Sequence, residues 1–340
     1  MIPDLVTVGG LTVDNVVAAD GTVGLAKAGG NGAYSAVGAL MWRPAVGLVS
    51  AAVASYPRET IRRLESGGLD LGGVVWRDEE LTSSNWFIYD AEGRREEGLS
   101  SPPGALAEAG FPTDRLSPSQ TSQWREILRA RSTTNEISYS EFRNRHPLSQ
   151  RQIPPAWKDT RAVLLAPSQP DVMHEMLDFF KPGGAVVIAD PGWQLAEHKL
   201  DQLAPLLSKL DAFLPSEVEL RALVPGADLE HALRVLSDYC PGALAVKLGA
   251  KGSLVWNRVT DTPASVPAEA TETVDPTGAG DSFCGGFLVG LLETGDAVQA
   301  ARFGSMSASR IVAHFGADGA LLAHPDGASA LSQKAAMECR

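Results

Sequence analysis

The stretch Ala162-Val163-Leu164-Leu165-Ala166 begins a regular alternation of short apolar runs and longer amphipathic segments that continues to Leu248. We predict buried strands at 162–166, 185–189, 212–214 and 243–248, and helices at 172–180, 200–210, 217–223 and 229–240. Strands separated by helical segments indicate βαβ units and a parallel sheet. The alternation therefore predicts a doubly wound α/β fold with a mostly parallel sheet between two helical layers.

The N-terminal part extends the same pattern and adds two segments of a different kind. We predict strands at 5–10, 11–19 and 45–53, a helix at 33–41 and the end of a helix at 61–67. Residues 72–98 predict a hairpin that projects from the core, because Trp86–Tyr89 is strongly β-prone and a turn follows it. Residues 100–160 are polar, and we expect a surface insertion there rather than a separate domain. The whole chain, 1–340, is thus interpreted as one domain.

Composition excludes several classes of protein. The chain has 340 residues, 44% of them hydrophobic, which is enough to form a full core. Its net charge of −12 argues against nucleic acid as a partner, because a phosphate backbone requires a basic surface. The apolar run at 283–292 is too short to span a membrane. Three scattered cysteines and the absence of a signal-peptide pattern favour a cytoplasmic protein.

The most specific motif is Val274-Asp275-Pro276-Thr277-Gly278-Ala279-Gly280-Asp281-Ser282-Phe283, at the start of an apolar helix. The N–H groups of Gly278, Ala279 and Gly280 are expected to point out of the helix N-terminus. Such groups bind an anion, which is useful where charge develops on a transferring phosphoryl group. Asp281 lies within reach of a substrate hydroxyl and is a candidate general base. The alternative interpretation is a tight turn with an acid that favours the helix dipole.

The string resembles the C-terminal signature of the PfkB/ribokinase-like carbohydrate kinases, Asp-Thr-x-Gly-Ala-Gly-Asp. This resemblance implies a ribokinase-like fold with a small β-lid, and it implies ATP and Mg²⁺ as cofactors. It assigns Asp281 as the base that deprotonates the acceptor hydroxyl, and Gly278, Ala279 and Gly280 as the anion hole. It further assigns Thr277 to the nucleotide site and Asp275 to a loop that binds K⁺ in many relatives.

Other segments agree with the family in order and spacing. Asp14 resembles the first-strand acid that binds sugar hydroxyls, and Gly29, Gly30 and Asn31 resemble the glycine pair beneath the sugar. Tyr34 stands near a position where the family usually has Asn. Without the resemblance, Asp14 could equally be a surface strand residue, and the glycines a turn.

Two further elements concern the metal and the nucleotide. Ser216 and Glu219 resemble the family's Asn-x-x-Glu element, in which Glu219 is associated with magnesium through water. The same pair is also typical of a helix capping box, and the two interpretations are compatible. Lys247, Gly249 and Gly252 resemble the strand and turn that hold the nucleotide, although a simple turn explains the glycines equally well.

The predicted lid consists of residues 11–27 and 72–98. Closing it would exclude water, a competing phosphoryl acceptor. Its sheet could also pair with a second copy, which makes a homodimer through the lid compatible with the sequence. The hairpin carries Arg94 and Arg95, which could contact an anionic sugar or ATP phosphates, although exposed arginines are more often solvated.

These observations predict an ATP-dependent kinase that phosphorylates a hydroxyl of a small sugar or sugar-like molecule. Ribose, a fructose-like sugar, a keto-deoxy acid and a nucleoside all fit, so a nucleoside kinase is one alternative. A non-catalytic sugar or nucleotide sensor is the alternative from another class, and the intact Asp281 argues against it. The chain has no P-loop string, and its Gly30-x-Gly32 element lacks the third glycine of a dinucleotide fingerprint.

Overall fold

The structure is a computed structural model that describes residues 2–79, 85–91, 94–97, 139–258 and 260–323. Its strands are β1 (Leu5–Val8), β2 (Thr12–Val17), β3 (Val23–Gly29), β4 (Val46–Val53), β5 (Leu69–Arg77), β6 (Asn85–Tyr89), β7 (Arg95–Glu97), β8 (Ala162–Leu165), β9 (Val186–Ala189), β10 (Ala212–Phe213), β11 (Ala243–Lys247), β12 (Ser253–Asn257) and β13 (Thr262–Val266). Its helices are α1 (Asn31–Leu40), α2 (Arg58–Ser66), α5 (Tyr139–Arg145), α6 (Pro170–Phe180), α7 (Gly192–Ala196), α8 (Leu200–Leu207), α9 (Glu217–Leu223), α10 (Leu229–Tyr239), α11 (Ala279–Thr294), α12 (Ala297–Val312) and α13 (Gly316–Ala323). Short 3-10 turns lie at Gln150–Gln152, Pro155–Asp159, Lys181–Gly183 and Gly249–Lys251.

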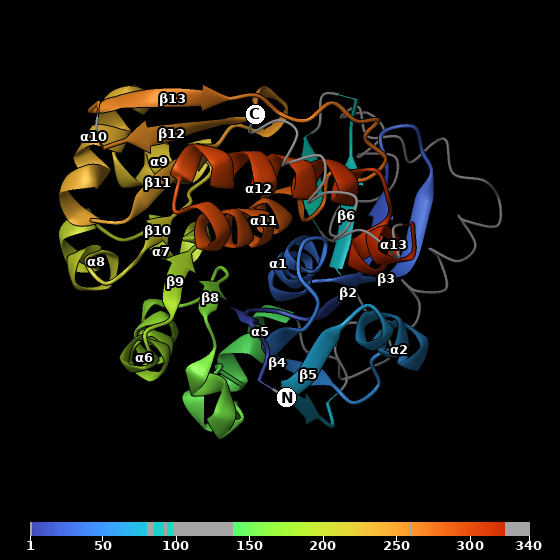
Figure 1. The fold of residues 1–340 in the computed structure, drawn as a ribbon. Helices are drawn as coiled ribbons and strands as arrows, with labels where there is room; N and C mark the ends of the chain where they lie inside the picture. The colour runs from blue at the N-terminus through green and yellow to red at the C-terminus, as the bar shows by residue number, and fades with distance from the viewer. Residues whose placement is uncertain (1, 80–84, 92–93, 98–138, 259, 324–340) are drawn as a thin grey trace.

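The large sheet has the strand order β13-β12-β11-β10-β9-β8-β1-β4-β5 (Figure 1). Every neighbouring pair from β11 to β5 is parallel, and the two pairs that involve β12 are antiparallel. Parallel strands require crossover connections, and helices supply them on both faces. The prediction of a doubly wound, mostly parallel α/β fold is therefore confirmed.

The central strands are buried on both faces, which explains their continuous apolar runs. In β1, Leu5 packs into a cluster that includes α1, α11 and α12, whereas Val6 and Val8 pack into a cluster with α6, α8 and α10. All three side chains are at most 1% exposed. Successive residues of a strand point to opposite faces, so both helical layers are anchored on the same strand.

Helix α1 lies against the N-terminal half of α11 at unusually short range. A Cβ built on Gly38 would lie 2.3 Å from the carbonyl oxygen of Ser282, and one built on Gly285 would lie 2.1 Å from that of Ser35. No side chain fits at either position, so glycine on each helix permits the contact. This contact sets the position of α1 relative to the Gly278–Asp281 segment.

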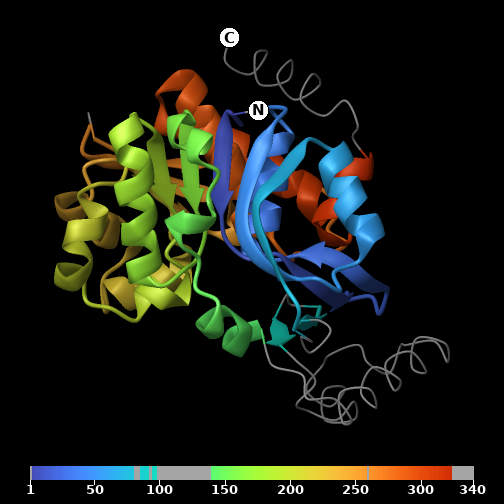
Figure 2. The same ribbon diagram turned by 90° about the horizontal axis from the view of Figure 1, so that it is seen from below.

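A second sheet has the order β3-β2-β6-β7 and lies, with α5, at one end of the large sheet (Figure 2). Its strands largely coincide with the residues predicted as the lid, 11–27 and 72–98, but β3 continues to Gly29 and the second segment begins too early. Residues 72–77 belong to β5, the edge strand of the large sheet, which pairs with β4 as far as Arg77. Within β5, Gly73 provides space for the Trp157 ring, 2.9 Å from where its Cβ would be.

The prediction of a surface insertion over 100–160 was wrong for its described part. Residues 98–138 lie outside the described residues, whereas 139–160 pack onto the core. Phe142, Ile153 and Trp157 are between 1% and 4% exposed, and the Thr160 hydroxyl donates to the Pro3 carbonyl at 2.9 Å. These apolar residues are too widely spaced to show a helix or strand period, so the sequence pattern did not reveal them.

Among the described residues, no helix combines the length and apolar character needed to cross a membrane.

Replacing Trp157 with Ala is expected to lower the free energy of unfolding by about 3–5 kcal/mol, because it removes a large buried ring. Urea denaturation followed by circular dichroism measures the change. Trp193→Ala is the matched control, since Trp193 is 55% exposed and its loss should change the free energy by about 0.5 kcal/mol or less. Equal effects of the two substitutions would contradict the packing of residues 139–160 on the core.

Candidate active site

The Gly278–Asp281 segment forms the first turn of α11, a helix of 16 residues. Gly278 is the N-cap residue and has a left-handed backbone, with φ of +76°. A Cβ at this position would lie 2.2 Å from the Tyr34 ring, so both the conformation and the contact require glycine. We call residues Gly278, Ala279 and Gly280 the anion loop.

Two of the three N–H groups predicted for this loop are available to a ligand. The N–H groups of Gly278 and Gly280 donate to no acceptor among the described residues, as is usual in a first helical turn. The N–H of Ala279 instead donates to the Pro276 carbonyl at 3.3 Å. The loop therefore presents the positive end of α11, where an anion is stabilised by the helix dipole.

Asp281 is a partly buried carboxyl at this helix end, and its pKa is raised from 3.8 to about 7. Burial is the main cause, and the nearby Asp190 and Glu219 raise the pKa further, whereas Lys247 and Arg95 lower it. A carboxyl that titrates near neutral pH is well matched to general base catalysis.

Beneath the anion loop, Lys247 forms an ion pair with Asp190. Lys247 ends β11 and Asp190 follows β9, so both side chains lie at the carboxyl end of the large sheet. The Lys247 ammonium is 3.6 Å from Cys284 Sγ and 3.6 Å from the position of a Cβ on Gly280. Burial alone would lower the pKa of Lys247, but the Asp190, Cys284 and Glu219 groups raise it above its ordinary value. Lys247 therefore stays charged beside the loop.

Asp190 is a site residue that the sequence analysis missed. It directly follows the predicted strand at 185–189, and an acid at the carboxyl end of a central parallel strand was the available signal. Its Oδ2 accepts from Lys247 and from Cys284, whereas its Oδ1 is buried without a partner among the described residues.

Glu219 serves the capping role proposed for it and also faces the site. Its carboxylate accepts from the Ser216 N–H at 2.7 Å, and the Ser216 hydroxyl accepts from the Glu219 N–H at 3.4 Å. Burial and the neighbouring Asp190 raise the pKa of Glu219, and Lys247 lowers it. Carboxylate oxygens are suitable ligands for Mg²⁺, and the unpartnered Asp190 Oδ1 is an acceptor that such an ion would satisfy. The described residues contain no cluster of three metal-ligating side chains, so water and phosphate would have to complete the coordination.

Asp14 is a buried strand residue, not an exposed one, with 1% of its surface accessible. The Thr12 hydroxyl donates to its carboxylate at 2.9 Å. Its Oδ2 lies 1.9 Å from the position that a Cβ on Gly29 would take, so the carboxylate rests directly on the glycine backbone. Gly30 is the N-cap of α1, with φ of +95°, and Asn31 begins the helix.

Tyr34 joins the two halves of the site. Its ring packs on Gly278, and its hydroxyl is buried without a partner among the described residues. Burial raises its pKa, and the charges of Asp14, Asp275 and Asp281 act in the same direction. Asp14, the predicted acceptor-binding acid, and Asp281, the predicted base, therefore both act electrostatically on the Tyr34 phenol.

The small sheet contacts the same region through Tyr89 of β6. The hydroxyls of Tyr89 and Thr277 are 2.9 Å apart and share a hydrogen bond. Of the two hairpin arginines, Arg94 forms an ion pair with Asp90, whereas the Arg95 guanidinium lies 5.0 Å from the centre of the Phe87 ring. Tyr89 thus connects the small sheet to Thr277 by a hydrogen bond, and the charge of Arg95 lowers the pKa of Asp281.

The remaining predicted residues lie around this centre. Asp275 is buried, and its carboxylate accepts from the Thr277 N–H at 2.9 Å and from the Gly316 N–H at 3.4 Å, which holds the loop in shape. Gly249 and Gly252 form the turn between β11 and β12, both with positive φ. Lys247 reaches the anion loop, and these two glycines follow it in the adjacent turn.

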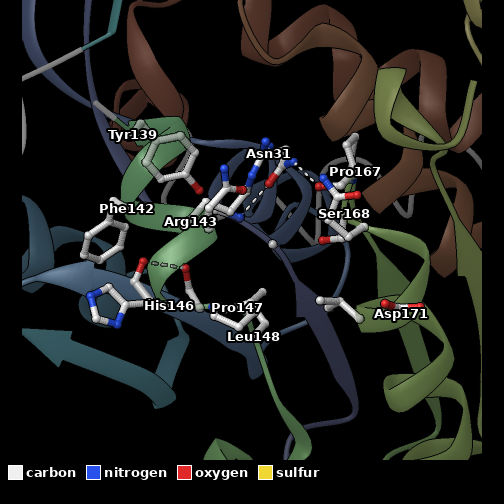
Figure 3. Close-up of a pocket in the computed structure, with 17 residues that line it drawn as sticks. Asn31, Tyr139, Phe142, Arg143, His146, Pro147, Leu148, Pro167, Ser168 and Asp171 are labelled. Atoms are coloured by element: carbon white, nitrogen blue, oxygen red, sulfur yellow. Dashed lines mark hydrogen bonds between the residues drawn. The ribbon is translucent and has the colours of Figure 1, made fainter. Parts of the chain in front are cut away.

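A cavity of about 260 Å³ lies beside Asn31, between the carboxyl ends of β1 and β8 and helix α5 (Figure 3). Tyr139, Phe142, Arg143 and His146 line it from α5 and the residues that follow. Asp281 and the anion loop do not line this cavity. This wall was not predicted from the sequence, because residues 100–160 were expected to form a surface insertion.

Known proteins similar to this chain are kinases. Residues 121–323 match the model of the pfkB family carbohydrate kinases. The cytidine kinase of Thermococcus kodakarensis is 24% identical over 92% of this chain and 97% of its own, and a nucleoside kinase of Methanothermobacter thermautotrophicus is 30% identical over 52% of this chain and 56% of its own. A solved adenosine kinase of Sinorhizobium meliloti has a TM-score of 0.69 at 15% identity, covering 98% of this chain and all of that chain. An E. coli putative ribokinase II in complex with ATP and Mg²⁺ has a TM-score of 0.66 at 17% identity, covering 97% of this chain and all of that one.

The family match spans more than half of the chain, which therefore belongs to the pfkB family of carbohydrate kinases. It is an ATP-dependent phosphotransferase of ribokinase-like fold.

Replacing Gly278 with Ala is expected to lower kcat by about 100-fold or more, because the new Cβ collides with Tyr34 and displaces a donor that stabilises transferring charge. The control is Gly295→Ala at the other end of the same helix. Gly295 also has a left-handed backbone, with φ of +65°, but its Cβ would meet nothing within 4 Å. ADP release by both variants measures the effect, and equal activity would contradict the role of the anion loop.

Proposed function

We propose that Asp281 is the general base of this kinase and that the anion loop and Lys247 bind the phosphoryl group during its transfer. The observation that carries the proposal is a carboxyl with a pKa of about 7 at the positive end of α11, close to a buried ammonium. A phosphoryl transfer site needs little covalent chemistry and depends on positioning and on electrostatic stabilisation.

In this mechanism the acceptor hydroxyl lies against Asp281. The carboxylate takes the hydroxyl proton, the acceptor oxygen forms a bond to the γ-phosphorus, and the bond from that phosphorus to the bridging oxygen of ADP breaks. The negative charge on the migrating group is stabilised by the N–H groups of Gly278 and Gly280 and by Lys247.

Mg²⁺ would be held from one side by Asp190 and Glu219, in part through water, and would neutralise phosphate charge when bound. For the nucleotide, we assign Lys247, Thr277 and the turn with Gly249 and Gly252, following the resemblance. A K⁺ ion beside Asp275 belongs to the same proposal.

For the acceptor, we assign Asp14, Gly29, Gly30 and Asn31. Asp14 and the glycine backbone lie in contact, which supports a surface for hydroxyl groups. A small sugar is the proposed acceptor. The match to a cytidine kinase over 92% of this chain makes a nucleoside the second candidate.

We further propose that residues 1–340 form one domain, that the small sheet acts as a lid over the acceptor, and that the kinase works in the cytoplasm, where ATP is available. The hydrogen bond between Tyr89 and Thr277 supports the lid, because it joins the small sheet to the loop that holds phosphate. The edge strands β3 and β7 could pair with a second copy, and light scattering tests the resulting homodimer.

Replacing Asp281 with Asn should lower kcat by about 10²- to 10⁴-fold, because the amide cannot accept the hydroxyl proton. The acceptor is chosen from a panel of pentoses, hexoses, sugar acids and nucleosides by coupled ADP release, and ATP affinity is followed by calorimetry. ATP affinity should remain close to that of the unchanged chain. Asp296→Asn is the control, since Asp296 caps α12 at the far end of α11 and asparagine caps equally well. Near-normal turnover by the Asp281 variant would refute the assignment, and binding without turnover across the panel would favour a sensor.

The pH dependence gives an independent measurement. Since Asp281 must be unprotonated to act, kcat/KM is expected to rise with pH up to about 7 and to fall about tenfold per unit below it. In a Lys247→Met variant the rise of kcat/KM with pH should occur at higher pH, because the Lys247 ammonium lowers the pKa of Asp281. A rise of kcat/KM centred near pH 4 in the unchanged enzyme would contradict a buried base.

The raised pKa of Asp281 also makes the stability of the folded chain depend on pH. The pKa of Asp281 is raised in the folded state, so the folded chain binds this proton more tightly than the unfolded chain, and stability is lost as pH rises from the ordinary value of 3.8 to about 7, above which the loss is complete. Asp281→Asn should therefore raise the melting temperature more at pH 8 than at pH 5, which thermal denaturation measures without any acceptor.

A further inference from the structure

The wall of the cavity beside Asn31 includes an arginine whose charge is not neutralised by any described residue. Arg143 of α5 is half-buried, and its Nε is fully enclosed without a hydrogen-bond partner. Among the described residues, no carboxylate forms an ion pair with its guanidinium. An enclosed donor without an acceptor costs free energy, so a ligand that satisfies it gains affinity.

Most other polar groups around the cavity are already engaged. His146 contacts Glu79 at 2.8 Å. The Asn31 amide accepts from the Gly10 N–H at 2.6 Å and donates to the Pro167 carbonyl at 3.0 Å. The one acidic side chain that lines the cavity among the described residues is Asp171, which is exposed in the first turn of α6. Arg143 is therefore a charged residue of the cavity wall with an enclosed nitrogen that has no hydrogen-bond partner among the described residues.

Tyr139 supplies a second donor to the same space. Its hydroxyl lies over Gly10, 2.3 Å from where a Cβ on that residue would be, and points into the cavity in Figure 3. Burial raises its pKa to about 12, although Arg143 acts in the opposite direction. At neutral pH the phenol is protonated and can donate a hydrogen bond together with Arg143.

The cavity and the anion loop each contact a residue in the first turn of α1. Asn31 lines the cavity, and Tyr34, three residues further along, packs on Gly278. Three residues correspond to about 4.5 Å along a helix. A molecule of sugar size could therefore have one end at the anion loop and the other in the cavity.

We propose that the cavity binds an anionic substituent of the acceptor, a carboxylate or a phosphate, and that Arg143 and Tyr139 determine this specificity. The inference rests on the proposed function, since the acceptor hydroxyl is placed at Asp281. A guanidinium forms paired, charge-assisted hydrogen bonds with either group, and these bonds are stronger than those to neutral hydroxyls. The preferred substrates are thus sugar acids or sugar phosphates.

The test uses matched acid and neutral compounds on the full chain: gluconate with glucose, ribonate with ribose, and fructose 6-phosphate with fructose. Calorimetry measures binding, and ADP release measures turnover. The acid or phosphate of at least one pair should be preferred by about 10-fold or more, and Arg143→Gln should lower that preference by about 10- to 100-fold. Arg143→Lys should recover part of it. The pairs with gluconate and ribonate test for a carboxylate, and the pair with fructose 6-phosphate tests for a phosphate.

Arg145→Gln is the control, because Arg145 lies on the same short helix, is exposed and pairs with Glu141. It should leave the preference unchanged. Preference for the neutral member of every pair, or an equal effect of Arg143→Gln on both members, would overturn the inference while leaving the kinase proposal intact. Arg143-dependent binding of an acid without any turnover would instead support the cavity and refute the proposed function.

Discussion

Three carboxyl groups and one ammonium meet at the positive end of α11, and the chemistry of the site depends on their balance. Burial is the main cause that raises the pKa of Asp281 and of Glu219, Asp190 raises both further, and Lys247 offsets part of this effect. Burial strengthens these interactions, because the low local dielectric screens them less than water does. The result is a carboxyl that titrates near pH 7 beside a cation that stays charged, which is the pairing that proton removal and phosphate binding require.

The relative position of the two halves of the site follows from close backbone packing. Glycines at 38 and 285 bring α1 against α11, and this contact places Tyr34 on Gly278. Asn31 and the cavity lie at the start of α1, whereas the groups proposed to bind phosphate lie on α11 and at the end of β11. Since protein interiors are densely packed, a shift of either helix would move the acceptor relative to the phosphoryl group. The hydrogen bond between the hydroxyls of Tyr89 and Thr277 extends this connection to the small sheet.

Residues 139–160 illustrate why part of the site could not be predicted. Their buried residues are scattered among polar ones, and only packing against β4 and β5 shows that Trp157 belongs to the core. Arg143 likewise had no motif, and its meaning depends on which groups surround it. By contrast, the capping pair Ser216 and Glu219 was visible in the sequence, because both partners lie within one helical turn.

The amino-acid sequence by itself determined the alternation of strands and helices, the glycine-rich start of α11 and the acid that follows it, since these depend on neighbours a few residues apart. Only the tertiary structure decided that Asp190 and Lys247, 57 residues apart in the chain, form an ion pair beneath that acid. It also decided that α5 forms a wall of the cavity beside Asn31. Charge coupling and cavity shape arise where distant segments meet in space, and no local pattern encodes them.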